Sequence, residues 1–142
     1  MSKKLTFGKL LGIILCILAA AGTVVLLCLN IYFGGQMKLI DKYFTAIERD
    51  DFESYRTCLE GGKDIPDLEE QFSVERDSYM LLQDNENFRI NPKFSGRQKI
   101  DGNIYLLTLD MTIYNDSESY YDGVLLIPVC RENGKWVLTS LW

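Results

Sequence analysis

Residues 10–33 carry no charge, and nearly all of these 24 residues are apolar. At 1.5 Å per residue, a helix of this length spans about 36 Å and can cross a hydrocarbon core of roughly 30 Å. A cleavable signal peptide has a shorter apolar region of roughly 7 to 15 residues, and cleavage at Ala19-Ala20-Ala21 would leave an apolar new N-terminus. We therefore expect residues 10–33 to be retained as a membrane-spanning helix.

Lysines flank this run on both sides and determine its expected orientation. Lys3, Lys4 and Lys9 precede it, whereas Lys38 and Lys42 follow it. Positive charge favours the cytoplasmic side of a membrane, and the short N-terminal tail carries no acidic residue. We therefore predict a cell-membrane protein with a basic cytoplasmic tail at 1–9, a single pass at 10–33 and an extracytoplasmic domain at 34–142.

Apolar residues spaced by three and four predict helices in the first half of this domain. The first helix is expected at 36–49. Its apolar stripe comprises Met37, Leu39, Ile40, Tyr43, Phe44 and Ile47. Asp50 is expected to cap a second helix, with Glu53 completing a capping box and Gly61 ending it. A third helix is expected at 66–82.

After residue 87 the pattern changes to the alternation that is typical of strands. Strands are expected at 88–100, 104–114, 120–131 and 136–142. The second strand has the clearest apolar face, formed by Tyr105, Leu107, Leu109, Met111 and Ile113. Asn133-Gly134 predicts a tight hairpin that pairs Cys130 with Val137. The same hairpin would place Pro128 opposite Thr139, where the missing proline N–H predicts a bulge or an unpaired edge.

Helices followed by an antiparallel meander predict an α+β domain, in which two or three helices pack on a curved four-stranded sheet after the N-terminal transmembrane helix. Three segments resemble the nuclear transport factor two-like, cystatin-like cone superfamily. They are the opening helix, AIERDDFESYRTCLE at 46–60 and ENGKWVLTSLW at 132–142. They are most similar to its small membrane-tethered bacterial members of unknown function. The resemblance covers 37–142 and implies a cone that can enclose a pocket. Because the superfamily includes enzymes, ligand binders and assembly modules, the fold assigns no function.

Charge and composition narrow the chemistry of the domain. The chain carries a net charge of -5, and the three lysines before the apolar run add +3, so the domain alone carries -8. An acidic domain argues against binding nucleic acid or anionic lipid heads. The chain has no histidine, which removes the commonest general base and the commonest zinc ligand. We expect no metal and no cofactor, because the sequence contains no motif for either.

In enzymes of the superfamily, a pocket Asp or His acts together with Tyr or Asp groups. A regular hairpin centred on Asp116-Ser117 would place Asp122 beside Met111, on the apolar face of the sheet. There Asp122 could act as a base with Tyr105 or Tyr120, because burial among aromatic rings raises a carboxyl pKa. In the alternative interpretation Asp122 is solvated near a strand end, as we also expect for Asp110 on the wetter face.

Two of the four cysteines, Cys16 and Cys28, lie in the apolar run and are interpreted as ordinary apolar residues. Cys58 and Cys130 each fall on an apolar stripe of the domain. In an extracytoplasmic compartment they could form a disulfide, and free buried thiols are the alternative.

Three functional hypotheses follow from the sequence. The favoured one is a membrane-anchored extracytoplasmic binding or interaction module without catalytic activity, which takes a protein partner or a small ligand. The second is a tethered small enzyme of the cone-fold type that uses Asp122. The third is a small accessory subunit of a membrane complex, which contacts its neighbours through the transmembrane helix and an exposed aromatic patch around Trp136 and Trp142. The oligomeric state is left open.

Small residues recur every four positions along the apolar run, at Gly8, Gly12, Cys16 and Ala20. This spacing lets two membrane helices approach closely, although small residues are also common in membrane helices in general. If the stripe drives self-association, Gly12→Ile reduces the association signal in a membrane reporter assay. An unchanged signal would rule out this dimer.

Overall fold

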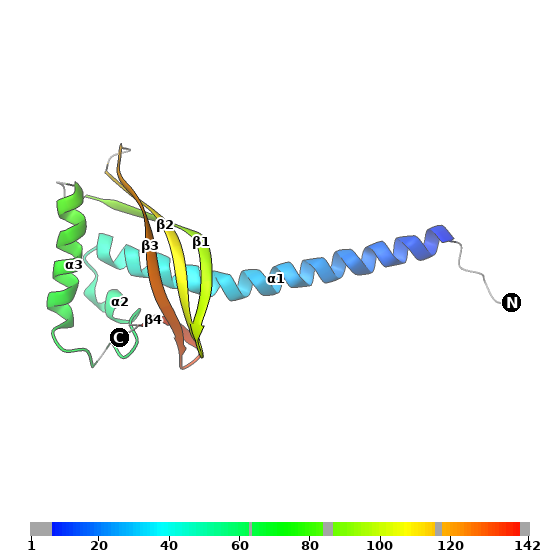
Figure 1. The fold of residues 1–142 in the computed structure, drawn as a ribbon, viewed down its shortest axis with the longest axis horizontal. Helices are drawn as coiled ribbons and strands as arrows, with labels where there is room; N and C mark the ends of the chain where they lie inside the picture. Colours follow the sequence, from blue (N-terminus) through cyan, green and yellow to red (C-terminus); the bar gives the residue numbers. More distant parts are fainter. Residues whose placement is uncertain (1–6, 63, 84–86, 116–117, 140–142) are drawn as a thin grey trace. The chain divides into compact units, whose positions relative to one another are not determined.

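The structure is a computed structural model, and it describes residues 7–62, 64–83, 87–115 and 118–139 (Figure 1). The chain divides into two compact units, Met1–Gly35 and Gln36–Trp142. Helix α1, Phe7–Glu48, contributes to both units. The two helices expected at 10–33 and 36–49 are therefore one helix, and Gly34 and Gly35 lie inside it.

The part of α1 in the first unit contains an 18-residue stretch, Leu11–Cys28, that is long and apolar enough to cross a membrane. All of these residues are exposed to solvent. Large apolar side chains do not stay in water when an apolar phase is available, because transfer out of water is favourable. By length and composition the stretch fits a membrane span or a signal anchor.

In the second unit, α1 is followed by the short helix α2, Phe52–Arg56, and by α3, Leu68–Gln83. Contrary to our expectation, Asp50 does not cap α2. It has a left-handed φ of 58°, and its N–H donates to Ile47 O at 3.4 Å while the N–H of Asp51 donates to Ala46 O at 2.9 Å. These two bonds form a Schellman motif that ends α1.

Because Asp50 terminates α1, the N-cap of α2 is the next residue, Asp51. Its Oδ1 accepts a hydrogen bond from the backbone N–H of Ser54 at 3.0 Å. The expected end of α2 at Gly61 is also wrong, because the helix ends at Arg56 with Thr57 as its C-cap.

The four strands form one antiparallel sheet in the order β1-β2-β3-β4, which confirms the α+β fold class. Their bounds are β1, Arg89–Asp101; β2, Ile104–Asn115; β3, Glu118–Glu132; and β4, Lys135–Leu138. Asn133 and Gly134 both have positive φ, 49° and 80°, which confirms the tight hairpin between β3 and β4.

The β3–β4 ladder includes the expected pair of Cys130 and Val137 and ends at Val129 and Leu138. Pro128 lies just beyond the ladder and uses only its carbonyl, which accepts a hydrogen bond from Thr139 N at 3.1 Å. The free edge of β4 is covered by the chain after α2, since Leu138 N donates to Cys58 O at 2.7 Å and Glu60 N donates to Leu138 O at 2.8 Å.

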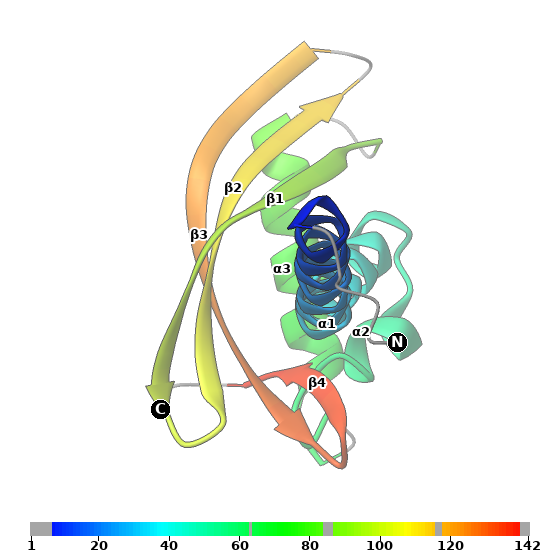
Figure 2. The ribbon, with the colours of Figure 1, turned by 90° about the vertical axis from the view of Figure 1, so that its right-hand side faces the viewer.

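The sheet curves, and the helices of the second unit lie on its concave side (Figures 1 and 2). The core lies between these two layers. Its fully buried apolar residues are Ile40, Phe44 and Ile47 of α1, Leu107, Leu109 and Ile113 of β2, Val129 of β3, and Cys58. The apolar face predicted for β2 is confirmed, because its odd-numbered residues from Leu107 to Ile113 are all buried.

Gln36 is the first residue of the second unit, and only 1% of its surface is exposed. Neither its Nε2 nor its Oε1 has a hydrogen-bond partner among the described residues. A buried polar group without a partner destabilises the folded state by about 1–3 kcal/mol.

Gln36→Met, which keeps the shape of the side chain and removes the amide, is therefore expected to raise the free energy of unfolding by about 1–3 kcal/mol. Urea unfolding of the full chain in detergent micelles, followed by tryptophan fluorescence, measures this change. Gln98→Met on exposed β1 is the matched control and should leave stability nearly unchanged. A loss of stability in Gln36→Met would contradict the prediction.

Candidate functional site

Asp122 lies on the outer face of the sheet, so the interpretation that turned it toward the core is wrong. It is exposed and pairs with Thr112, whose Oγ1 donates to Asp122 Oδ1 at 2.8 Å. The expected partner, Met111, pairs with Gly123 instead. The cause is a bulge at Tyr120, between the pairs Ile113–Tyr121 and Tyr114–Ser119, because one extra residue moves every later side chain to the opposite face.

The two tyrosines proposed to act with Asp122 do not form a site with it. Tyr105 is half-buried on the concave face and pairs with Val129. Tyr105 lies seven residues along β2 from Thr112, which is the strand partner of Asp122. The two β2 residues are therefore roughly 23 Å apart. The side chain of Tyr120 lies outside the described residues. Asp110 is exposed, as expected.

Cys58 and Cys130 are both buried free thiols, so the structure does not contain the disulfide that we considered. Cys58 belongs to the core cluster and its Sγ donates to Ser54 O at 3.3 Å. Cys130 follows the core residue Val129 on β3, and strand alternation therefore places it on the other face of the sheet. Burial raises the pKa of both thiols, which disfavours the reactive thiolate.

The small-residue stripe of α1 lines a shallow depression on the first unit. Gly12, Cys16 and Ala20 form it together with Ile13 and Ile17. A Cβ added at Gly12 would meet no other atom, so the helix itself leaves this surface open. The side-chain surroundings of Gly8 lie outside the described residues. Association through this face stays a prediction.

A carboxylate with two tyrosine donors links the three helices of the second unit, and the sequence did not reveal it. Glu75 of α3 accepts from the hydroxyl of Tyr43 on α1 at 2.5 Å and from that of Tyr55 on α2 at 2.7 Å. The rings of Tyr43 and Tyr55 stack, with their centroids 5.2 Å apart. One signal could have located Glu75, since spacings of three and four place it with Phe72 and Tyr79 on the buried stripe of α3.

Both tyrosines of this cluster stay protonated well above the usual pKa of about 10 for a phenol. Burial raises the pKa of Tyr43 most, and the negative charge of Glu75 raises it further. Burial and the hydrogen bond to Glu75 raise the pKa of Tyr55 in the same direction. The phenols therefore act as hydrogen-bond donors at neutral pH, and the cluster holds α1, α2 and α3 together.

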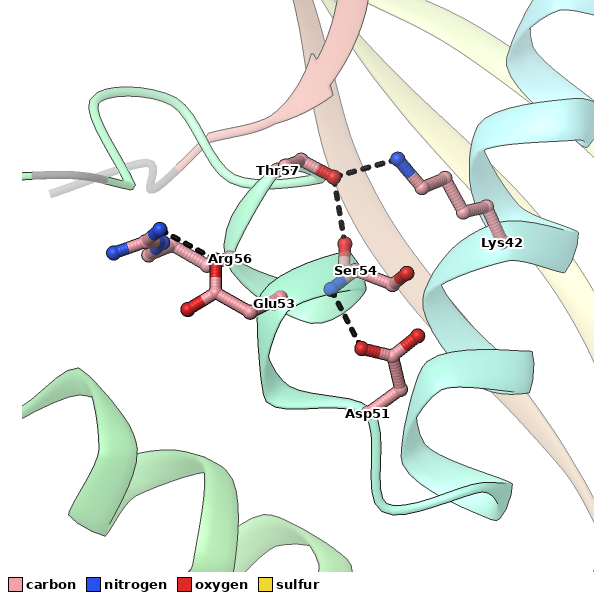
Figure 3. A network of polar contacts seen from close by, with 6 residues as sticks. All are labelled: Lys42, Asp51, Glu53, Ser54, Arg56 and Thr57. Atoms are coloured by element: carbon pink, nitrogen blue, oxygen red, sulfur yellow. Dashed lines mark hydrogen bonds and ion pairs between the residues drawn. The ribbon is translucent and has the colours of Figure 1, made fainter.

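A polar network fixes α2 beside α1, as Figure 3 shows. Lys42 Nζ of α1 donates to Thr57 Oγ1 at 2.6 Å, and Thr57 Oγ1 donates to Ser54 O at 2.8 Å. Arg56 Nη2 donates to Glu53 Oε2 at 2.5 Å. The hydrogen bond from Ser54 lowers the pKa of the Asp51 carboxyl, so the cap is charged at neutral pH.

A cleft in the second unit lies next to this network and has a volume of about 500 Å³. The end of α2, the loop after it, and the β3–β4 hairpin line this cleft. Its charged side chains are Arg56, Asp64, Glu132 and Lys135. The loop passes so close to α2 that a Cβ on Gly62 would collide with Arg56 O. We call this space the α2–β4 cleft.

The interior between sheet and helices offers much less room. The cavity described there has a volume of about 140 Å³ and lies between Tyr79 of α3 and residues of β2 and β3. It is lined mainly by apolar side chains, including Met111, Ile113 and Leu125. No group of three or more potential metal ligands occurs among residues of the described ranges.

No protein-family model and no curated protein matches the chain. Solved structures do match it. An NTF-2-like protein of unknown function from Shewanella oneidensis MR-1 aligns with a TM-score of 0.54 at 9% identity, over 76% of this chain and 98% of that one. A variant of the protein Rv3472 from Mycobacterium tuberculosis, also of unknown function, aligns with a TM-score of 0.51 at 14% identity, over 76% and 68%. The domain therefore has the NTF2-like fold, which is the fold that the resemblance implied.

Removal of one hydroxyl from the Glu75 cluster tests its role. Tyr43→Phe is expected to reduce the free energy of unfolding by about 1.5–3 kcal/mol, because Glu75 loses a buried donor.

Because the folded-state pKa values of Tyr43 and Tyr55 are raised, their stabilisation is complete below pH 10 and is lost as pH rises above 10. Urea unfolding between pH 7 and 11 measures both effects. Tyr114→Phe on β2 is the control, and equal losses in the two variants would contradict the prediction.

Proposed function

We propose that this protein is a membrane-anchored binding module without catalytic activity, whose domain lies outside the cytoplasm. The observation that carries the proposal is the filled interior of the NTF2-like domain. Ile40, Phe44 and Ile47 of α1 occupy the concave face of the sheet, where a cone could hold a substrate. The cavity of about 140 Å³ beside Tyr79 falls well below the roughly 300–1,000 Å³ of an ordinary ligand pocket.

The α2–β4 cleft is the surface that we propose for recognition. It combines two cationic and two anionic side chains with backbone from a loop that is held in place. The bonds of Leu138 to Cys58 and Glu60 attach this loop to the sheet, and Lys42 attaches α2 to α1. A surface that is already ordered loses little conformational entropy on binding, which favours affinity.

Both edges of the sheet favour recognition by side chains over addition of a strand from the partner. On β1, the carboxylate of Glu48 accepts the Ile90 N–H at 2.6 Å, and Pro92 has no N–H to offer. On β4, Leu138 is already paired with the loop after α2. Protected edges of this kind prevent pairing with a further strand.

The other two hypotheses receive less support. An enzyme that uses Asp122 needs a buried base, and Asp122 is exposed and bonded to Thr112. An accessory subunit that docks through exposed tryptophans needs an accessible Trp136. Trp136 is half-buried and packs against the core. Its ring meets the Tyr105 ring edge to face, with the two ring centroids 5.7 Å apart. Trp142 lies outside the described residues.

Charge reversal in the cleft tests the proposal. Full-length protein carrying Asp64→Lys, purified from its native membrane after cross-linking, is expected to retain at least about tenfold less of its partner, a loss of about 1.4 kcal/mol. Asp77→Lys is the matched control, because Asp77 is an exposed aspartate on α3 away from the cleft. Quantitative mass spectrometry measures the captured partner. Equal capture by the two variants would exclude the cleft as the binding surface.

A further inference from the structure

The charge of the domain is not evenly distributed, and β1 departs most from the average. This strand carries Arg89, Lys93, Arg97 and Lys99, and its only acidic residue is the last one, Asp101. Over residues 60–77, in contrast, seven acidic side chains occur with only two basic ones. A domain with a net charge of -8 therefore contains one basic strand.

This basic strand is an edge of the sheet (Figure 2). Lys93 and Lys99 are exposed. Asp110 lies opposite Lys93 in the register, but the structure forms no ion pair between them. Arg89 is already paired with Glu48 at 3.3 Å, and the half-buried Arg97 lies over the Tyr105 ring at 3.9 Å, so the lysines are the cations most available to a partner.

Large apolar side chains are exposed between these cations. Phe94 is 41% exposed and Ile100 is 46% exposed, each next to a lysine in the sequence. The register of β1 against β2 shifts between Phe94 and Gly96 and again between Lys99 and Asp101. Such irregularities bend a strand and re-aim its side chains. Lys93, opposite Asp110, lies on the outer face and Lys99, opposite Tyr105, lies on the concave face, so the exposed cations and apolar side chains flank this edge of the sheet from both faces.

We propose that β1 docks on the anionic lipid headgroups of the membrane that anchors α1. Lysines attract an anionic surface, and an aromatic and an aliphatic side chain beside them can enter the interfacial region, as in other interfacial segments. The acidic segment at 60–77 is repelled by the same surface. Attraction of β1 and repulsion of this segment therefore favour the same orientation of the domain. Although the net charge of the domain predicts that it avoids anionic lipids, the basic strand gives the domain one surface that attracts them.

The domain is tethered to the bilayer through α1, so even a weak attraction between β1 and the bilayer has a measurable effect. Gln36, where the domain begins, lies eight residues after Cys28, a helical distance of roughly 12 Å. Tethering makes docking an intramolecular step with a high effective concentration. A few charge contacts within about one Debye length are then sufficient to hold β1 at the anionic surface.

The test is lysine acetylation of the full-length protein in nanodiscs, with the extent at each lysine measured by mass spectrometry. Nanodiscs of phosphatidylcholine are compared with nanodiscs that contain one anionic phosphatidylglycerol in three lipids. Lys93 and Lys99 are expected to react about fivefold more slowly on the anionic discs, and salt at about 0.5 M should abolish the difference. Lys135, exposed on β4, is the internal control and should react equally on both.

A second variant pair separates docking from a general effect of the surface charge. Lys93→Glu is expected to remove most of the protection of Lys99, whereas Arg49→Glu, at an exposed position outside the cleft, should leave it unchanged. Equal reactivity of Lys93 and Lys99 on the two kinds of disc would overturn the proposal, as would equal protection of Lys135. Protection by dissolved glycerol phosphate on neutral discs would also overturn it, because it would indicate a small-anion site. Loss of partner capture in the cleft variant changes none of these results.

Discussion

The packing of one stripe of α1 against the concave face of the sheet is the interaction on which the rest of the domain depends. Ile40, Phe44 and Ile47 are at most 1% exposed, and they cover Leu107 and Leu109 of β2. Burial of each such side chain contributes about 1.5–3 kcal/mol. Because this helix occupies the middle of the cone, it also removes the space in which the fold could hold a substrate. The stability of the domain and the absence of a large interior pocket among the described residues have the same cause.

The short helix α2 depends on this packing as well. Five residues are too few for a stable isolated helix. Its geometry is therefore set by its neighbours: the Schellman motif of α1 before it, Lys42 beside it, the phenol of Tyr55 bound to Glu75, and the sheet edge at Leu138 after it. The same contacts define the wall of the α2–β4 cleft. A cleft built in this way keeps its shape when α2 has no stability of its own.

The sequence was sufficient for what depends on periodicity and on turn chemistry. It predicted the third helix, the order of the four strands, the apolar face of β2 and the hairpin at Asn133-Gly134, since each is encoded by neighbouring residues. It failed where one residue of register decides the outcome. The bulge at Tyr120 moved Asp122 to the outer face, and the Schellman motif that ends α1 at Asp50 transferred the cap from Asp50 to Asp51. Glu75 was missed because its two phenol partners lie on other helices.

Net charge is a weak guide to what a small domain binds, and β1 shows why. A sum of -8 over the domain describes the field at a distance, but within a Debye length of about 10 Å a partner responds to the groups that it faces. Along β1 these groups are lysines beside exposed apolar side chains, and along α3 they are carboxylates. The sequence contained both patterns, but only the sheet order, with β1 at an edge, makes the basic pattern available to a surface. The two surfaces of the domain therefore differ: the α2–β4 cleft, with its balanced charges, suits a partner with side chains of both signs, whereas β1 suits a uniformly anionic one.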